Sequence, residues 1–140
     1  MQLNTRFVGE ALLEAGEVDR ADRLTADLAG RTGGRLRQAL ILTARGDVLM
    51  RLGRLEEAAR RYGEAIALAE EIGSRSALAT ALLGAGEVAL AQGRVPQGVD
   101  RAAALCAELD MRHYRPRMER LVVAAGRASR SPAPAAAERT

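Results

Sequence analysis

The stretch Gly46-Asp-Val-Leu-Met-Arg-Leu-Gly53-Arg-Leu-Glu-Glu-Ala58 determines the fold, because its pattern of glycines recurs along the chain. Two glycines stand seven residues apart, and the same pair begins at Gly9 and at Gly86. With a further glycine at Gly126, the leading glycines are 37, 40 and 40 residues apart. A period of about 20–50 residues indicates one supersecondary unit that is copied and stacked, because a single copy cannot bury its own apolar face.

Each unit is predicted to be an antiparallel pair of helices with its turn at the second glycine. After Gly53, apolar side chains recur at intervals of three and four residues, the pattern of an amphipathic helix. They are Leu55, Ala58, Ala59, Tyr62, Ala65, Ile66 and Ala69. Leucines before Gly53 recur at similar spacing, and Gly73 is placed to end the second helix in a left-handed conformation.

The fold class predicted is therefore all-α: a right-handed α-solenoid of three helical hairpins plus a C-terminal closing helix, in one repeat domain over residues 1–128. The hairpins and the closing helix are expected at about residues 2–33, 35–73, 75–110 and 115–128. Within the third hairpin, the second helix is expected to run over 95–109 with Pro96 in its first turn, where a missing N–H is tolerated. Residues 129–140 lack periodic apolar positions and are predicted to be a disordered tail.

Composition favours a cytoplasmic helical protein without a membrane partner. The net charge is only +3, all 21 basic residues are Arg, and acids are interleaved with them. Charges interrupt every apolar run before it reaches the length of a signal peptide or a membrane span. The single cysteine, Cys106, excludes a disulfide within one chain.

The segment from Leu42 to Ala65 resembles a tetratricopeptide repeat. The residues that carry the resemblance are Leu42, Gly46, Leu49, Gly53, Leu55, Ala58, Tyr62 and Ala65. The third unit is similar at Leu82, Gly86, Gly93, Val95 and Gly98, and the first at Gly9, Leu12, Gly16, Val18 and Ala21. The resemblance covers about residues 2–109. One departure is Arg45, which stands where the family usually has an apolar residue.

The family resemblance implies a non-enzymatic protein–protein interaction scaffold or regulatory module, which binds a peptide or helix in its concave groove. The period of 37–40 residues is longer than usual for the family and resembles arrays in bacterial signalling and transcription-regulator proteins. Two alternatives remain open at this point. One is an Arg-mediated nucleic-acid-binding protein, and the other is an oligomerisation segment of a larger signalling ATPase or transcription regulator.

The candidate partner-binding groove combines a column of acids with apolar side chains. Glu10, Asp47 and Glu87 follow the leading glycines and should lie on one face. Such a column favours a cationic peptide, and Asp47→Arg is expected to abolish binding with little effect on melting. Pairing with Arg residues four positions away is the alternative role of these acids. The apolar groove candidates are Leu13, Met50, Leu83 and Leu90.

Other classes of site have less support. No catalytic, metal or cofactor site is predicted, since Cys106 and His113 are the only residues of their kinds. The densest basic cluster could contact nucleic acid through Arg for phosphates and a tyrosine for stacking. It consists of Arg112, Tyr114, Arg115, Arg117 and Arg120. The last helix carries a broad apolar run from Leu121 to Ala125, and the first helix begins with Leu3, Phe7 and Val8 without a preceding cap. The first hairpin is therefore expected to pair with a second copy, as a homodimer, or with sequence of a longer parent protein.

Overall fold

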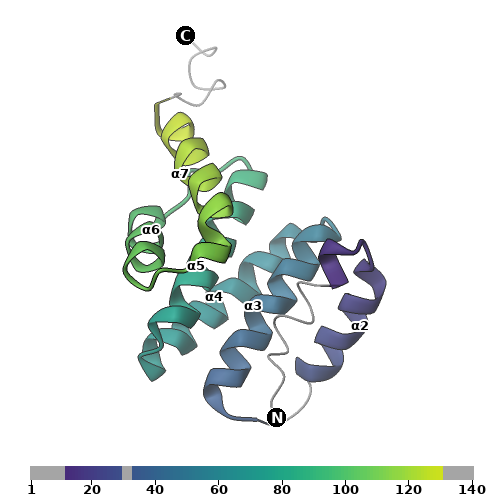
Figure 1. The fold of residues 1–140 in the computed structure, drawn as a ribbon. Helices are drawn as coiled ribbons and strands as arrows, with labels where there is room; N and C mark the ends of the chain where they lie inside the picture. Colours follow the sequence, from purple (N-terminus) through teal and green to yellow (C-terminus); the bar gives the residue numbers. More distant parts are fainter. Residues whose placement is uncertain (1–11, 30–32, 131–140) are drawn as a thin grey trace.

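Stacked helical hairpins make up the part of the chain that the computed structural model describes, residues 12–29 and 33–130. Over these ranges every regular element is a helix (Figure 1). The helices are α2 (Val18–Ala29), α3 (Arg35–Arg51), α4 (Leu55–Ile72), α5 (Arg75–Ala91), α6 (Val99–Glu108), the 3-10 turn η1 (Arg112–Tyr114) and α7 (Arg115–Arg130). Each helix packs on its neighbour in sequence, and α3, α5 and α7 also contact one another in succession. The predicted all-α solenoid is confirmed.

The second glycine of each unit closes the turn between the two helices of a hairpin. Gly16, Gly53 and Gly93 have φ of +79°, +78° and +73°, a left-handed conformation that side chains with a Cβ rarely adopt. At Gly53 the N–H donates to the carbonyl of Met50, and the next N–H donates to that of Leu49, at 3.1 and 2.9 Å. The same two bonds form at Gly16 and Gly93. This helix-ending motif explains why a glycine recurs at a fixed offset.

The leading glycines Gly46 and Gly86, together with Gly84, make room for large side chains instead. A Cβ on Gly46 would lie 2.7 Å from Cε1 of Tyr62, and one on Gly84 would lie 2.2 Å from the same atom. Tyr62 is fully buried against α3 and α5, the helices that carry these two glycines. A Cβ on Gly86 would lie 2.9 Å from Cδ2 of Leu121 on α7. Gly46 and Gly86 therefore each leave room for a side chain of a neighbouring helix.

The second helix of the third hairpin begins later than predicted. It starts at Val99 rather than at residue 95, so Pro96 is a buried residue of the preceding connection and not part of the first turn. The reason is Gly98, whose φ of +72° cannot continue a right-handed helix. In contrast, α7 extends two residues beyond the predicted end, to Arg130. The predicted first helix before residue 12 and the predicted tail from residue 131 lie outside the described residues.

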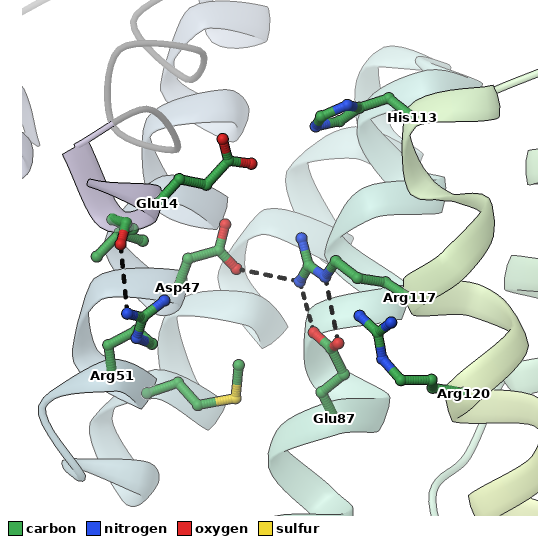
Figure 2. Close-up of a pocket in the computed structure, with 9 residues that line it drawn as sticks. Glu14, Asp47, Arg51, Glu87, His113, Arg117 and Arg120 are labelled. Carbon is green, nitrogen blue, oxygen red and sulfur yellow. Dashed lines mark hydrogen bonds and ion pairs between the residues drawn. The ribbon is translucent and has the colours of Figure 1, made fainter. Parts of the chain in front are cut away.

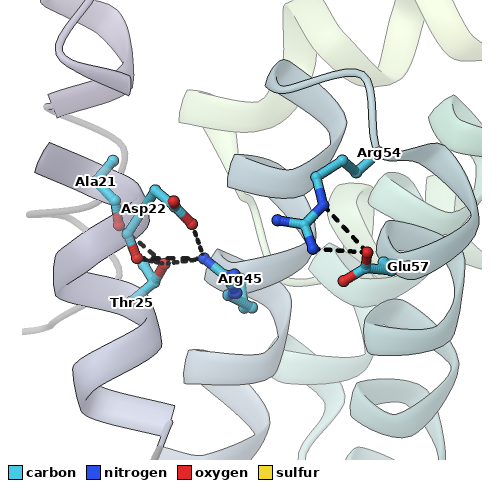
Figure 3. A network of polar contacts seen from close by, with 6 residues as sticks. All are labelled: Ala21, Asp22, Thr25, Arg45, Arg54 and Glu57. Atoms are coloured by element: carbon cyan, nitrogen blue, oxygen red, sulfur yellow. Dashed lines mark hydrogen bonds and ion pairs between the residues drawn. The ribbon is translucent and has the colours of Figure 1, made fainter. Parts of the chain in front are cut away.

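Arg45 replaces an apolar contact with polar ones. Its guanidinium bonds to the carboxylate of Asp22, and it lies 3.2 Å from the Asp22 carbonyl oxygen and 3.4 Å from Thr25 Oγ1. The Thr25 hydroxyl in turn donates to the Ala21 carbonyl at 2.8 Å. Figure 3 shows this network between α2 and α3. It also shows the ion pair between Arg54 and Glu57, which is exposed and is not part of the network. The departure from the family pattern is thus accommodated by a cross-helix ion pair.

Candidate partner-binding groove

A cavity of about 230 Å³ lies beside the row formed by α3, α5 and α7, the first helices of successive hairpins. Figure 2 shows side chains converging on it from α3 on one side and from α7 on the other. The cavity is lined by Leu13, Glu14, Asp47, Met50, Arg51, Glu87, His113, Arg117 and Arg120. Both charge signs and two apolar side chains therefore meet in one hollow.

Arg117 connects the two acids that line this cavity. Its Nη2 and Nε lie 2.5 and 3.2 Å from the two carboxylate oxygens of Glu87, and Nη2 lies 3.8 Å from Oδ1 of Asp47. The Tyr62 hydroxyl, on α4, donates to the same Oδ1 of Asp47. The side chain of Asp47 is only 10% exposed, and those of Glu87 and Arg117 are 23% and 28% exposed. The four groups form one partly buried polar network that joins α3, α4, α5 and α7.

The network fixes the protonation states of Tyr62 and Arg117. Burial raises the pKa of Tyr62 well above its usual value, and the negative charge of Asp47 raises it further. Burial alone would lower the pKa of Arg117, but the Glu87 hydrogen bond and the Asp47 charge outweigh that effect, so the pKa is raised. Tyr62 is therefore a neutral donor and Arg117 a permanent cation at neutral pH.

The predicted acidic column does not present free charge. Asp47 and Glu87 line the same cavity, as expected, whereas Glu10 lies outside the described residues. Both acids are already bound by Arg117 of the same chain, so they do not form an open site for a cationic peptide. Asp47 is also buried and hydrogen-bonded, which contradicts the expectation that Asp47→Arg leaves melting nearly unchanged.

The apolar groove candidates divide into two groups. Leu13 and Met50 line the cavity. Leu83 is fully buried in the hydrophobic core, so the prediction that it lines the groove is wrong. Leu90 packs against that same core and does not line the cavity either. Both leucines lie on α5, whose central residues are covered by helices on several sides.

Sequence reasoning missed five of the lining residues, and three of them had a readable signal. His113, Arg117 and Arg120 stand at intervals of four and three, which places them on one side of the chain as it enters α7. The other two, Glu14 and Arg51, had no comparable signal. Arg51 donates to the Leu13 carbonyl at 3.3 Å and so connects α3 to the preceding hairpin.

The basic cluster lacks the exposed tyrosine that was expected to stack on bases. Tyr114 is 6% exposed and packs in the core, so it cannot stack on a base. Arg112 and Arg115 lie 3.1 and 3.8 Å from Asp110, while Arg117 is bound to Glu87. Only part of the cluster's charge is thus available to phosphates.

From the buried Tyr62 hydroxyl we predict that the protein loses stability at alkaline pH. An unfolded tyrosine ionises near pH 10, whereas folded Tyr62 holds its proton beyond that. The contribution of the Tyr62 hydroxyl to the free energy of unfolding is therefore complete below about pH 10. It is lost as pH rises toward the pKa of folded Tyr62, because the folded state then binds more protons than the unfolded state. Urea unfolding at about pH 8 and pH 11 should show a smaller decline for Tyr62→Phe than for the wild type. Equal declines would contradict the assignment.

Comparison with known proteins finds a match to one family model. Residues 37–97 match the family model described as tetratricopeptide repeat. The match supports the resemblance seen in the repeats, and such repeats generally serve as protein–protein interaction modules. No curated protein and no solved structure gives a significant match.

Two other kinds of feature are absent from residues 12–29 and 33–130. None of the helices there is both long and apolar enough to cross a membrane. Over the same ranges, no group of three or more His, Cys, Asp or Glu side chains is placed to hold a metal ion.

Proposed function

We propose that the chain is a non-enzymatic protein-interaction module that binds a peptide or helix in the cavity between α3 and α7. The observation that supports this most is the combination of the apolar Leu13 and Met50 with charged groups around a single hollow. Peptide sites of this kind obtain affinity from apolar anchors and orientation from a few polar groups.

The charges still available in the groove suggest the chemistry of the partner. Arg117 is held by Glu87 and Asp47, so it contributes little to an incoming ligand. Arg51 and Arg120 line the cavity on opposite sides and both are exposed, so they outnumber the exposed acid of the lining, Glu14. We therefore expect a partner with an apolar side chain over Met50 and acidic groups near these two arginines, rather than the cationic partner predicted from sequence.

The interaction surface is inferred to extend beyond the matched residues 37–97. The turn at Gly16 has the same φ and the same two hydrogen bonds as the turns at Gly53 and Gly93. α7 packs on α5 as α5 packs on α3. These similarities support treating the flanking helices as units of the same array. A cytoplasmic signalling or transcription-regulator context remains a prediction.

Selection of peptides from a random library on the intact chain tests the proposal. Selected peptides should bind the wild type and lose about tenfold or more in affinity on Arg120→Glu, because reversing one charge at a contact costs about 1.4 kcal/mol or more. Met50→Arg should have a similar effect. Leu36→Arg is the matched control, since Leu36 is 49% exposed and does not line the cavity. Peptides that bind all four proteins equally would place the site elsewhere.

A further inference from the structure

We infer that α7 is a self-association surface, on which α7 of a second copy packs antiparallel across a two-fold axis at Val123. At 53% exposure, Val123 is the most exposed large apolar side chain in the described ranges, and its neighbour Val122 is 44% exposed. A shallow hollow of about 340 Å³ runs along the helix here, lined by Glu119, Arg120, Val123, Ala124 and Arg127. This surface adjoins the groove, with which it shares Arg120, but it includes none of the residues of the Asp47–Glu87–Arg117 network.

The exposed surface is the side of α7 that the fold leaves uncovered. Met118 and Leu121 face inward and are 5% and 2% exposed within the hydrophobic core. Glu119, Val123 and Arg127 follow one another at intervals of four residues, so they form a row on another side of the helix. An apolar residue thus stands at the centre of this row, with one acid before it and one base after it.

This row is complementary to itself in one orientation only. Glu119 and Arg127 each lie four residues, or about 6 Å along the axis, from Val123. If two copies of α7 run antiparallel about Val123, each Glu119 faces the Arg127 of the other copy, and the two ion pairs are related by symmetry. A parallel pair would place glutamate against glutamate and arginine against arginine. Within the described part of the chain, neither residue has an ion pair of its own that would compete.

The contact also removes valine side chains from water. The two valines of each copy would be covered on association, which is favourable at about 25 cal/mol per Å² of apolar area. A single pair of helices covers less area than a stable dimer interface normally does. The association is therefore expected to be weak and to depend on protein concentration.

Sedimentation of the full chain over a range of concentrations provides the first test. The wild type should shift from monomer toward dimer as concentration rises. Val123→Glu should remain monomeric, because it places two glutamates together on the two-fold axis. Circular dichroism checks that the helices are retained, as expected for an exposed position. A wild type that stays monomeric throughout would refute the proposal, and so would a dimer that Val123→Glu does not weaken.

Exchanging the two charges gives the sharper test. Glu119→Arg alone and Arg127→Glu alone should each weaken the dimer by about tenfold or more, because each places like charges opposite one another twice. The double variant Glu119→Arg/Arg127→Glu should restore wild-type association. Arg60→Glu, the same change of charge at an exposed position on α4, should leave the dimer unchanged.

The outcome of the charge exchange also separates other occupants of this surface. Failure of the double variant to recover would exclude the antiparallel register. A second result would be a monomer that binds an apolar dye on α7 only after residues 131–140 are removed, and it would assign the surface to residues 131–140. Either result overturns the proposal and leaves the groove function untouched, because the peptide-binding test uses different residues.

Discussion

Replacing Arg117 with methionine is expected to lower the free energy of unfolding by about 3 kcal/mol, near the lower end of the range for breaking a buried ion pair. The arginine faces Glu87 and Asp47, whose side chains are only 23% and 10% exposed. Without it, two carboxylates remain close together in a partly buried site with no compensating cation. Urea unfolding followed by circular dichroism measures the loss.

Two further variants identify the cause of that loss. Asp47→Asn combined with Glu87→Gln should recover much of the stability of Arg117→Met, because neutral amides need no counter-charge. Arg115→Met is the matched control: Arg115 is exposed and 3.8 Å from Asp110, so its removal should cost about 1 kcal/mol or less. A similar loss for both arginines would show that the groove network adds no particular stability.

The turns of the fold were predictable from sequence because their determinants are local. A glycine at Gly53 or Gly93 adopts a left-handed φ that few other residues tolerate, and the bonds it makes reach back only three residues. The start of α6 was not predictable by the same reasoning. Pro96 suits the first turn of a helix, but the chain continues irregularly to Gly98, which lies close against Leu82 of α5.

The groove was predictable only where it follows the repeat. Asp47 and Glu87 occupy equivalent places in successive units, and equivalent places lie on one face of a stack. The place equivalent to Arg117 is Ala77 in the preceding unit, so the period gave no indication that Arg117 would reach Glu87, 30 positions away, or Asp47, 70 positions away. The sign of the groove's charge depends on this long-range contact, which is why the cationic partner was a reasonable but unsupported prediction.

Tyr62→Ala is expected to cost about 3–5 kcal/mol, the range for removing a large buried ring. Tyr62 has no exposed surface, and its ring occupies the space that two glycines leave open on α3 and α5. The substitution also deprives Asp47 of the hydroxyl that donates to it. Tyr62→Phe separates the two effects, since it keeps the ring and should cost only about 1.5–3 kcal/mol for a hydrogen bond to a charged group.

Gly84→Ala tests whether the glycine exists to admit this ring. In the wild type, the new Cβ would lie 2.2 Å from Tyr62 Cε1, so the ring or a helix must shift, at about 1–3 kcal/mol. In the Tyr62→Ala background the same methyl group enters empty space, and the higher helix propensity of alanine should make the change neutral or stabilising. Gly63→Ala, which meets no atom within 4 Å, should behave alike in both backgrounds. An equal cost for Gly84→Ala in both would mean that another neighbour requires the glycine.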